Sequence, residues 1–167
     1  MLDVTALILA DHATLRRGFA MLDDAHDDPA ALAAVWKGLA RMLDVHAACE
    51  EEVFYPHLLR VGDEDAEDET DDAVRDHNEI RDAVHAAEQH GVGTDEWRAA
   101  VKKARVENDD HLAEEEHDAL PDFRRNAPDE LRARLAVQWL EWRYAHDSGA
   151  GVDTGDKDPQ QYIAEHS

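Results

Sequence analysis

The sequence is poor in the residues that form covalent cross-links or thiolate cages. Its 167 residues include a single cysteine, Cys49, so no disulfide can form within the chain and no cage of cysteines can hold a metal. The N-terminus has no basic and apolar leader of the secretory kind, and no stretch approaches the roughly 18 apolar residues of a membrane span. We therefore expect a protein of the reducing cytoplasm with no membrane association.

Basic residues are also scarce. Lysine and arginine number 17 against 40 aspartates and glutamates, which gives a formal net charge of −23. Such a surface repels phosphate backbones, so nucleic-acid binding is excluded as a function. Solubility is the simplest explanation of this charge, although the surface also attracts cations loosely.

What the sequence does contain is helical periodicity throughout. Hydrophobic residues make up 43% of the chain, enough for one domain with one core, and they recur every three or four positions. Helices are expected over Val4–Ala25, Pro29–Arg60, Thr70–His90, Asp95–Ala119 and Pro128–Ala145. The acidic stretch Gly62–Asp72 resembles a solvated loop, and its Asp/Glu-rich end also suits the start of the next helix. Residues 147–167 form a polar and irregular tail, in which Tyr162 and Ile163 are apolar enough to dock.

These segments predict an all-α fold. Four long helices with short loops favour an antiparallel up-down four-helix bundle, to which the fifth segment adds a C-terminal helix. The predicted organisation is one bundle domain over residues 1–146, followed by the tail 147–167.

The chain also repeats itself at a distance of 65 residues. The matched pairs are Asp11 and Asp76, His12 and His77, Leu15 and Ile80, Arg16 and Arg81, Lys37 and Lys102, His46 and His111, Glu50 and Glu115, Glu51 and Glu116, and Pro56 and Pro121. Two equivalent helix hairpins would pack with approximate two-fold symmetry. Coincidence among common residue types is the alternative, and the position of the matched polar residues on apolar faces argues against it.

Six ionisable residues lie where the core should be. They are His12, His46, Glu50, His77, His111 and Glu115. His12, for example, follows Ile8 by four residues and precedes Leu15 by three, which places it inside an apolar helical stripe. An unpaired carboxylate in a core costs several kcal/mol, and two carboxylates buried together repel each other. Two divalent cations would relieve both penalties.

The spacing of these residues supports a metal site. His46 precedes Glu50 by four residues, and His111 precedes Glu115 by four, so each pair presents an imidazole and a carboxylate to one centre. Histidine and glutamate without cysteine suit iron, manganese or zinc, and an oxygen-bridged pair with several histidines favours iron. A buried network of His–Glu hydrogen bonds is the alternative.

Other polar residues have weaker claims to a site. The spacing Glu114-x-x-His117 occurs in ferritin-like sites, but it is present once and off the inward face, so we expect both side chains at the surface. Tyr55 lies about half a turn off the ligand face and is expected to pack in the core. Arg16 and Arg81 are either solvated or approach the site as charge partners.

Four segments make the chain similar to the hemerythrin-like family, also called the HHE cation-binding domain. They are Asp11-His12-x-x-Leu15, His46-x-x-x-Glu50-Glu51 with Tyr55-Pro56, Asp76-His77-x-x-Ile80, and His111-x-x-x-Glu115-Glu116 with Pro121. The resemblance covers roughly residues 3–145 and leaves out the tail. It implies an antiparallel four-helix bundle around two non-haem iron ions with a bridging oxo or hydroxo group.

By this resemblance, His12 and His46 serve one iron, His77 and His111 serve the other, and the two glutamates bridge them. The resemblance implies O2, peroxide or NO as small-molecule partners. One departure is Arg81, because the oxygen carriers of the family have a second histidine at this position. It argues against reversible O2 carriage and predicts a symmetric centre with an exchangeable position.

Three functions remain open. The first is a redox-active di-iron protein that handles O2, peroxide or NO, with catalase-like breakdown of peroxide as its turnover. The second is an iron or oxygen sensing or storage module without turnover, for which the tail is the one handle for a protein partner. The third, a purely structural metal site, ranks last, because six buried ligands exceed what the stability of such a bundle needs.

Overall fold

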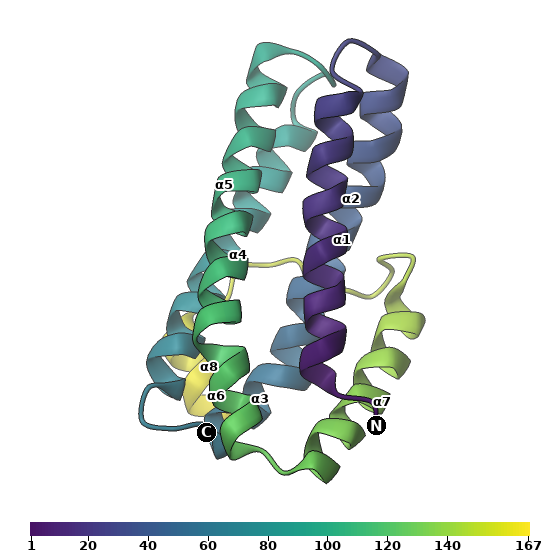
Figure 1. Cartoon of the computed structure of the whole chain (residues 1–167). Coiled ribbons are helices and arrows are strands. Elements are labelled where there is room, and N and C mark those ends of the chain that lie inside the picture. Colours follow the sequence, from purple (N-terminus) through teal and green to yellow (C-terminus); the bar gives the residue numbers. More distant parts are fainter.

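The computed structural model describes all 167 residues, and it contains helices and no strand. Four long helices lie side by side: α1 (Val4–Asp24), α2 (Pro29–Cys49), α4 (Ala66–Glu88) and α5 (Asp95–His117) (Figure 1). Helix α1 packs against α2, and α4 packs against α5. The all-α prediction is confirmed, while the up-down topology stays a prediction. None of the helices combines the length and the hydropathy that a membrane span requires.

Side chains at the first turns explain where the helices begin. Asp3, Asp28 and Thr94 each have extended backbone, and each side chain accepts a hydrogen bond from a backbone N–H of the following turn. Pro29 follows its cap at the first helical position, where its missing N–H costs nothing. These caps fix the starts of α1, α2 and α5.

The second predicted helix is continuous, but it is not regular. After α2 the chain forms one wider turn, η1 (Glu50–Phe54), and then continues as α3 (Tyr55–Val61). The N–H of Tyr55 bonds to the carbonyl oxygen of Glu50, five residues back instead of four. This extra residue in the turn brings Tyr55 onto the face of the helix that Glu50 occupies.

The acidic loop is shorter than predicted. The expectation of a solvated loop over Gly62–Asp72 is wrong from Ala66 onward, where α4 begins. Glu67, Asp68 and Glu69 stand in the first turn of α4, where the partial positive charge of the helix N-terminus favours carboxylates. The acidic residues that suggested a loop in the sequence therefore stabilise the start of α4.

The chain after α5 adds three shorter helices. Helix α6 (Ala119–Asn126) follows a break at Asp118, and α7 (Asp129–His146) packs against α1 and α2. The expected fifth helix is thus present, and it covers one side of the bundle.

The tail ends in a helix, so the expectation of an irregular tail over 147–167 is wrong for its last part. Helix α8 (Pro159–His166) packs against α4, and the connection from α7 crosses the bundle to reach it (Figure 1). Tyr162 and Ile163 are buried there, as their apolar character suggested.

The core consists of two apolar clusters with a polar layer between them. Ile8 and Val74 belong to one cluster, and Leu15 and Ile80 belong to the other. His12 lies between Ile8 and Leu15 along α1, and the corresponding residue of α4 lies between Val74 and Ile80. The predicted ligands therefore occupy the layer that separates the two clusters.

Candidate metal centre

All six predicted ligand residues are buried in one layer of the bundle. Their exposed fractions are 0% for His12, 3% for His46, 0% for Glu50, 1% for His77, 2% for His111 and 3% for Glu115. Each of the four long helices contributes a histidine, and the glutamates come from η1 and α5. The structure therefore brings together residues that are up to 103 positions apart in the sequence.

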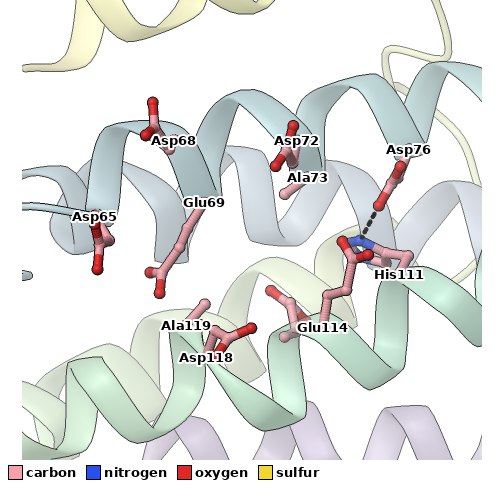
Figure 2. Close-up of a pocket in the computed structure, with 11 residues that line it drawn as sticks. Asp65, Asp68, Glu69, Asp72, Ala73, Asp76, His111, Glu114, Asp118 and Ala119 are labelled. Atoms are coloured by element: carbon pink, nitrogen blue, oxygen red, sulfur yellow. Dashed lines mark ion pairs between the residues drawn. The ribbon is translucent and has the colours of Figure 1, made fainter.

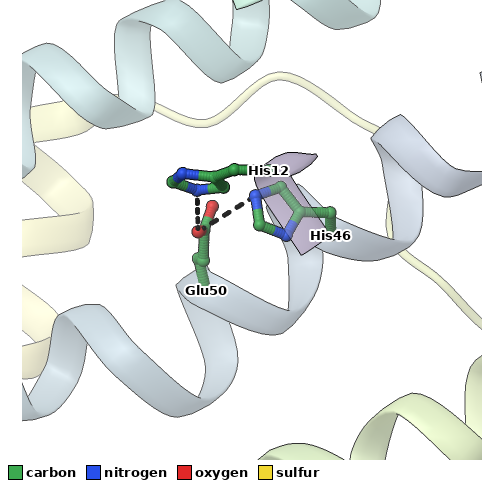
Figure 3. A group of neighbouring side chains, drawn as sticks. All are labelled: His12, His46 and Glu50. Carbon is green, nitrogen blue, oxygen red and sulfur yellow. Dashed lines mark ion pairs between the residues drawn. The ribbon is translucent and has the colours of Figure 1, made fainter. Parts of the chain in front are cut away.

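Glu50 stands at the middle of the four histidines. Its Oε1 lies 3.1 Å from Nε2 of His46 and 3.8 Å from Nε2 of His12. Figure 3 shows both imidazoles directed at this carboxylate. Its Oε2 lies 3.2 Å from Nε2 of His77 and 3.9 Å from Nε2 of His111. One carboxylate thus faces a pair of imidazoles on each side.

Two overlapping groups have donor atoms close enough for a metal ion. In one group the donors of His12, His46 and Glu50 lie within 4.8 Å of one another, and in the other those of Glu50, His77 and His111 do. Glu115 belongs to neither group, but its Oε2 lies 3.2 Å from Nε2 of His12. The arrangement is two adjacent three-residue sites that share Glu50, with Glu115 beside the first.

Several buried inward-facing atoms form no hydrogen bond, although they lie 3.1 to 3.8 Å from one another in contacts between histidine and glutamate. They are Nε2 of His12, Nε2 of His46, Oε1 of Glu50 and Oε2 of Glu115. Leaving a buried polar atom unpaired costs about 1–3 kcal/mol, so four in one place need an explanation. Metal ions bound by these atoms would supply it, and the donor set fits two divalent cations.

The outward-facing nitrogen of each histidine lies near a carboxylate. Nδ1 of His12 is 2.9 Å from Glu116, that of His77 is 2.9 Å from Glu51, that of His111 is 3.4 Å from Asp76, and that of His46 is 3.7 Å from Asp11. An ionised carboxylate can only accept, so it favours the tautomer with hydrogen on Nδ1 and a free lone pair on Nε2. These carboxylates follow the 65-residue repeat, because Glu51 corresponds to Glu116 and Asp11 corresponds to Asp76. From the sequence, only the ligand residues themselves were predicted to belong to the site.

The two arginines of the repeat bind the carboxylates and not the inward-facing atoms. Arg81, which is 1% exposed, donates to both oxygens of Glu51 at 2.9 and 2.8 Å. Arg16, with a side chain 41% exposed, donates to Glu116 at 2.7 Å. Both arginines are charge partners behind a histidine, which was one of the two roles considered for them.

Charges inside the layer are strongly coupled. Burial raises the pKa of Glu50, but the neighbouring imidazoles, His46 first, hold this pKa well below its usual range. Burial lowers the pKa of His12, but Glu115 and Glu50 raise it to about 10. Glu50 thus stays ionised, and the layer favours positive charge in the form of protons or metal ions.

A comparison with known protein families agrees with this geometry. The model of the hemerythrin HHE cation binding domain matches residues 3–123. The chain belongs to this family. No curated protein and no solved structure matches it. The matched residues end before α7.

Tyr55 is a member of this HHE domain's site that the sequence did not reveal. Its hydroxyl donates to Oε1 of Glu115 at 3.0 Å and lies 3.4 Å from Oε2 of Glu50. Burial, together with the charges of Glu115 and Glu50, raises the pKa of Tyr55 well above its ordinary value, so the phenol keeps its proton. The expectation that Tyr55 only packs is wrong, because it assumed a regular helix where η1 adds one residue to a turn.

The pair Glu114 and His117 behaves as expected. Glu114 and His117 are exposed and stay outside the layer. Cys49 is fully buried, and burial raises the pKa of its thiol, which disfavours the reactive thiolate. It is therefore a small core residue.

A cavity of about 430 Å³ lies between α4 and α5 (Figure 2). It is lined by Asp65, Asp68, Glu69, Asp72, Ala73, Asp76, His111, Glu114, Glu115, Asp118 and Ala119. No lysine or arginine lines it, and its lining includes two buried predicted ligands, His111 and Glu115. Its potential favours cations and admits neutral molecules, but it opposes anions.

Proposed function

We propose that this HHE domain holds two non-haem iron ions at the centre of an antiparallel up-down four-helix bundle. His12 and His46 bind one ion, His77 and His111 bind the other, and Glu50 and Glu115 lie between them. One observation carries this proposal: the inward Nε2 atoms converge on Glu50 while every Nδ1 atom faces a carboxylate. Imidazole and carboxylate donors without thiolate, in two sites that share a carboxylate, favour iron.

Iron at this place would supply one-electron chemistry and coordination positions for O2, peroxide or NO. The protein's own residues orient the imidazoles through Glu51 and Glu116, and Tyr55 holds a proton beside Glu115. The apolar clusters on both sides of the layer limit the access of water. Arg81 is directed to Glu51 and leaves two histidines for each ion, which supports reaction with the bound molecule over reversible O2 carriage.

Catalase-like breakdown of peroxide is the turnover that we propose first. Two molecules of peroxide give one O2 and two waters, so the reaction needs no other oxidant or reductant. Peroxide is neutral, and the acidic cavity does not oppose its entry. Release of O2 from peroxide, followed with an oxygen electrode, would support this activity. Iron-loaded protein without such release would leave the second candidate function described below.

Metal content and the visible spectrum of aerobically purified protein test the iron centre itself. We expect about two irons per chain, in keeping with two sites sharing one carboxylate, together with charge-transfer bands in the visible range. Glu50→Ala removes the shared carboxylate and should lose both irons. Glu52→Ala is the matched control, because Glu52 is exposed in the same turn. Zinc, or a folded protein without metal, would contradict the proposal.

Iron handling without turnover is a second candidate function, and the acidic cavity favours it. A cavity that is lined by carboxylates and that includes His111 and Glu115 in its lining suits the entry of Fe2+. Asp72→Asn together with Asp118→Asn should slow the uptake of Fe2+ in stopped-flow measurements. Asp109→Asn with Asp110→Asn removes the same charge from exposed positions outside the cavity. Equal rates for the two double variants would rule out this route.

We also propose a cytoplasmic location. Its support is the single buried cysteine, which gives the chain no disulfide to protect it outside a reducing compartment. A protein partner at the tail has less support, because α8 is docked on α4.

A further inference from the structure

The chain beyond the family-matched residues reaches the metal layer. Lys157 precedes α8, and its Nζ lies 2.8 Å from Oε2 of Glu51. Glu51 is the carboxylate whose Oε1 lies 2.9 Å from Nδ1 of His77, and it also accepts from Arg81. A buried carboxylate behind one predicted ligand therefore has two cationic partners, one of which comes from outside residues 3–123.

Lys157 is held in place by its backbone and by the helix that follows. The side-chain amide of Asn78 donates to the carbonyl oxygen of Lys157 at 2.8 Å and accepts from its N–H at 3.0 Å. Gln160 donates to Asp71 at 2.6 Å, and the hydroxyl of Tyr162 donates to the carbonyl oxygen of Glu51. The lysine side chain is 22% exposed. Its position is thus built into the fold and is not that of a mobile surface lysine.

The same extension reaches the other half of the layer through α7. Nε of Arg143 lies 3.3 Å from Asp11, whose Oδ2 is 3.7 Å from Nδ1 of His46. Trp139 of α7 packs edge-on against the ring of His46, at 6.0 Å between ring centres. The extension thus places one cation behind a histidine in each half of the metal layer. The contact between Lys157 and Glu51 is shorter and more buried than the contact between Arg143 and Asp11.

We propose that the C-terminal extension sets the reduction potential of the metal centre, with Lys157 as its main positioning residue and Arg143 as the weaker one. This inference rests on the proposed di-iron function. A carboxylate that accepts the Nδ1 proton makes the imidazole a stronger donor, which favours Fe3+. A cation bound to that carboxylate withdraws part of its negative charge and also repels the more highly charged ion. Lys157 therefore favours Fe2+ at the ion held by His77.

The test is the reduction potential of the iron-loaded, full-length protein, measured by spectroelectrochemistry. Lys157→Met should lower the potential of one iron, Arg143→Met should lower the other less, and Lys157→Arg should restore the value of the unaltered protein. Lys103→Met is the matched control, because Lys103 forms an ion pair with exposed Glu79. A potential that responds equally to Lys157→Met and Lys103→Met would overturn the inference.

A further variant separates charge from loosening of α8. Tyr162→Phe removes the hydroxyl that donates to the carbonyl oxygen of Glu51 but changes no charge. An equal fall in potential for Tyr162→Phe and Lys157→Met would assign the effect to packing and overturn the role of the lysine charge. Iron analysis comes first for every variant. If the unaltered protein contains no iron, both the di-iron function and this inference are contradicted. If it contains two irons and Lys157→Met has the same potential as the unaltered protein, only this inference is contradicted.

Discussion

At the scale of the residue, the main feature is that each histidine of the layer has a different neighbour at each ring nitrogen. Nε2 faces Glu50 or Glu115, and Nδ1 faces an acidic residue outside the layer. Such a ring cannot flip without exchanging its carboxylate partners. The carboxylates thus fix the orientation of each ring before any ion binds, which reduces the cost of ordering the ligands on binding.

Tyr55 contributes a hydrogen bond that can be measured. Tyr55→Phe keeps the ring in the core but leaves Oε1 of Glu115 without its donor. We expect the free energy of unfolding to fall by about 2 kcal/mol, the usual cost of an unpaired buried group. Denaturant unfolding of the variant checks this value. Tyr144→Phe, at a tyrosine 78% exposed, should change nothing, and an unchanged stability in Tyr55→Phe would contradict the assigned bond.

Glu69 predicts a pH dependence of stability. Burial first, and then the charges of Asp122, Asp63, Asp118 and Asp65, raise its pKa from the ordinary 4.5 of a glutamate to about 7. Between these values the folded state holds more protons than the unfolded state. The contribution of this group to stability is therefore fully present at low pH and is lost as the pH rises through about 7.

Replacing the carboxylate should remove this dependence. Glu69→Gln should stabilise the protein relative to the unaltered chain at pH 8 and much less at pH 5, as measured by denaturant unfolding at equal metal content. Glu67→Gln is the control, since Glu67 is exposed in the same turn. The same gain at both pH values would show that repulsion at Glu69 is not the cause.

At the scale of the element, the wide turn η1 decides which residues share the metal layer. In a regular α-helix, each residue advances about 100° around the axis. Without the extra residue of η1, the side chain of Tyr55 would therefore lie about 100° around the helix from where it is now. The N–H of Tyr55 instead bonds to the carbonyl of Glu50, and both side chains face the layer. Turns of this type are frequent at functional sites, and this one brings a proton donor to the two glutamates.

The start of α2 depends on a single side chain. Oδ1 of Asp28 accepts from the N–H groups of Ala30 and Ala31 at 2.9 and 3.1 Å. Asp28→Ala should lower the free energy of unfolding by about 1 kcal/mol, a typical value for the loss of an N-cap. Asp27→Ala is the control, because Asp27 is exposed and pairs only with His26. Equal unfolding midpoints for the two variants would contradict the capping role.

At the scale of the whole molecule, the net charge of −23 opposes the compact state. Carboxylates crowd the cavity between α4 and α5, where like charges lie close together (Figure 2). Salt screens such repulsion, and at about 1 M the Debye length is about 3 Å. We expect the thermal midpoint to rise with NaCl and equally with KCl. A midpoint that falls with both salts would mean that attractive ion pairs outweigh the repulsion.

Periodicity and spacing were sufficient for much of this protein. The helical class, the helix starts at Pro29 and Asp95, and the burial of the six ligand residues follow from the local pattern of apolar and polar residues. The family followed from two His-x-x-x-Glu motifs with a preceding histidine each, and the family match confirms it. Local patterns succeed here because each helix must direct one face to the core, and its sequence records which residues lie on that face.

The amino-acid sequence by itself determined which side chains enter the core and thus which could bind metal. Only the tertiary structure decided what stands behind them: Glu116 behind His12, Glu51 behind His77, and Lys157 behind Glu51. It also decided that Tyr55 faces the layer and that the tail ends in a docked helix. These features depend on contacts between residues far apart in the chain and on one irregular turn, and no short-range pattern encodes either.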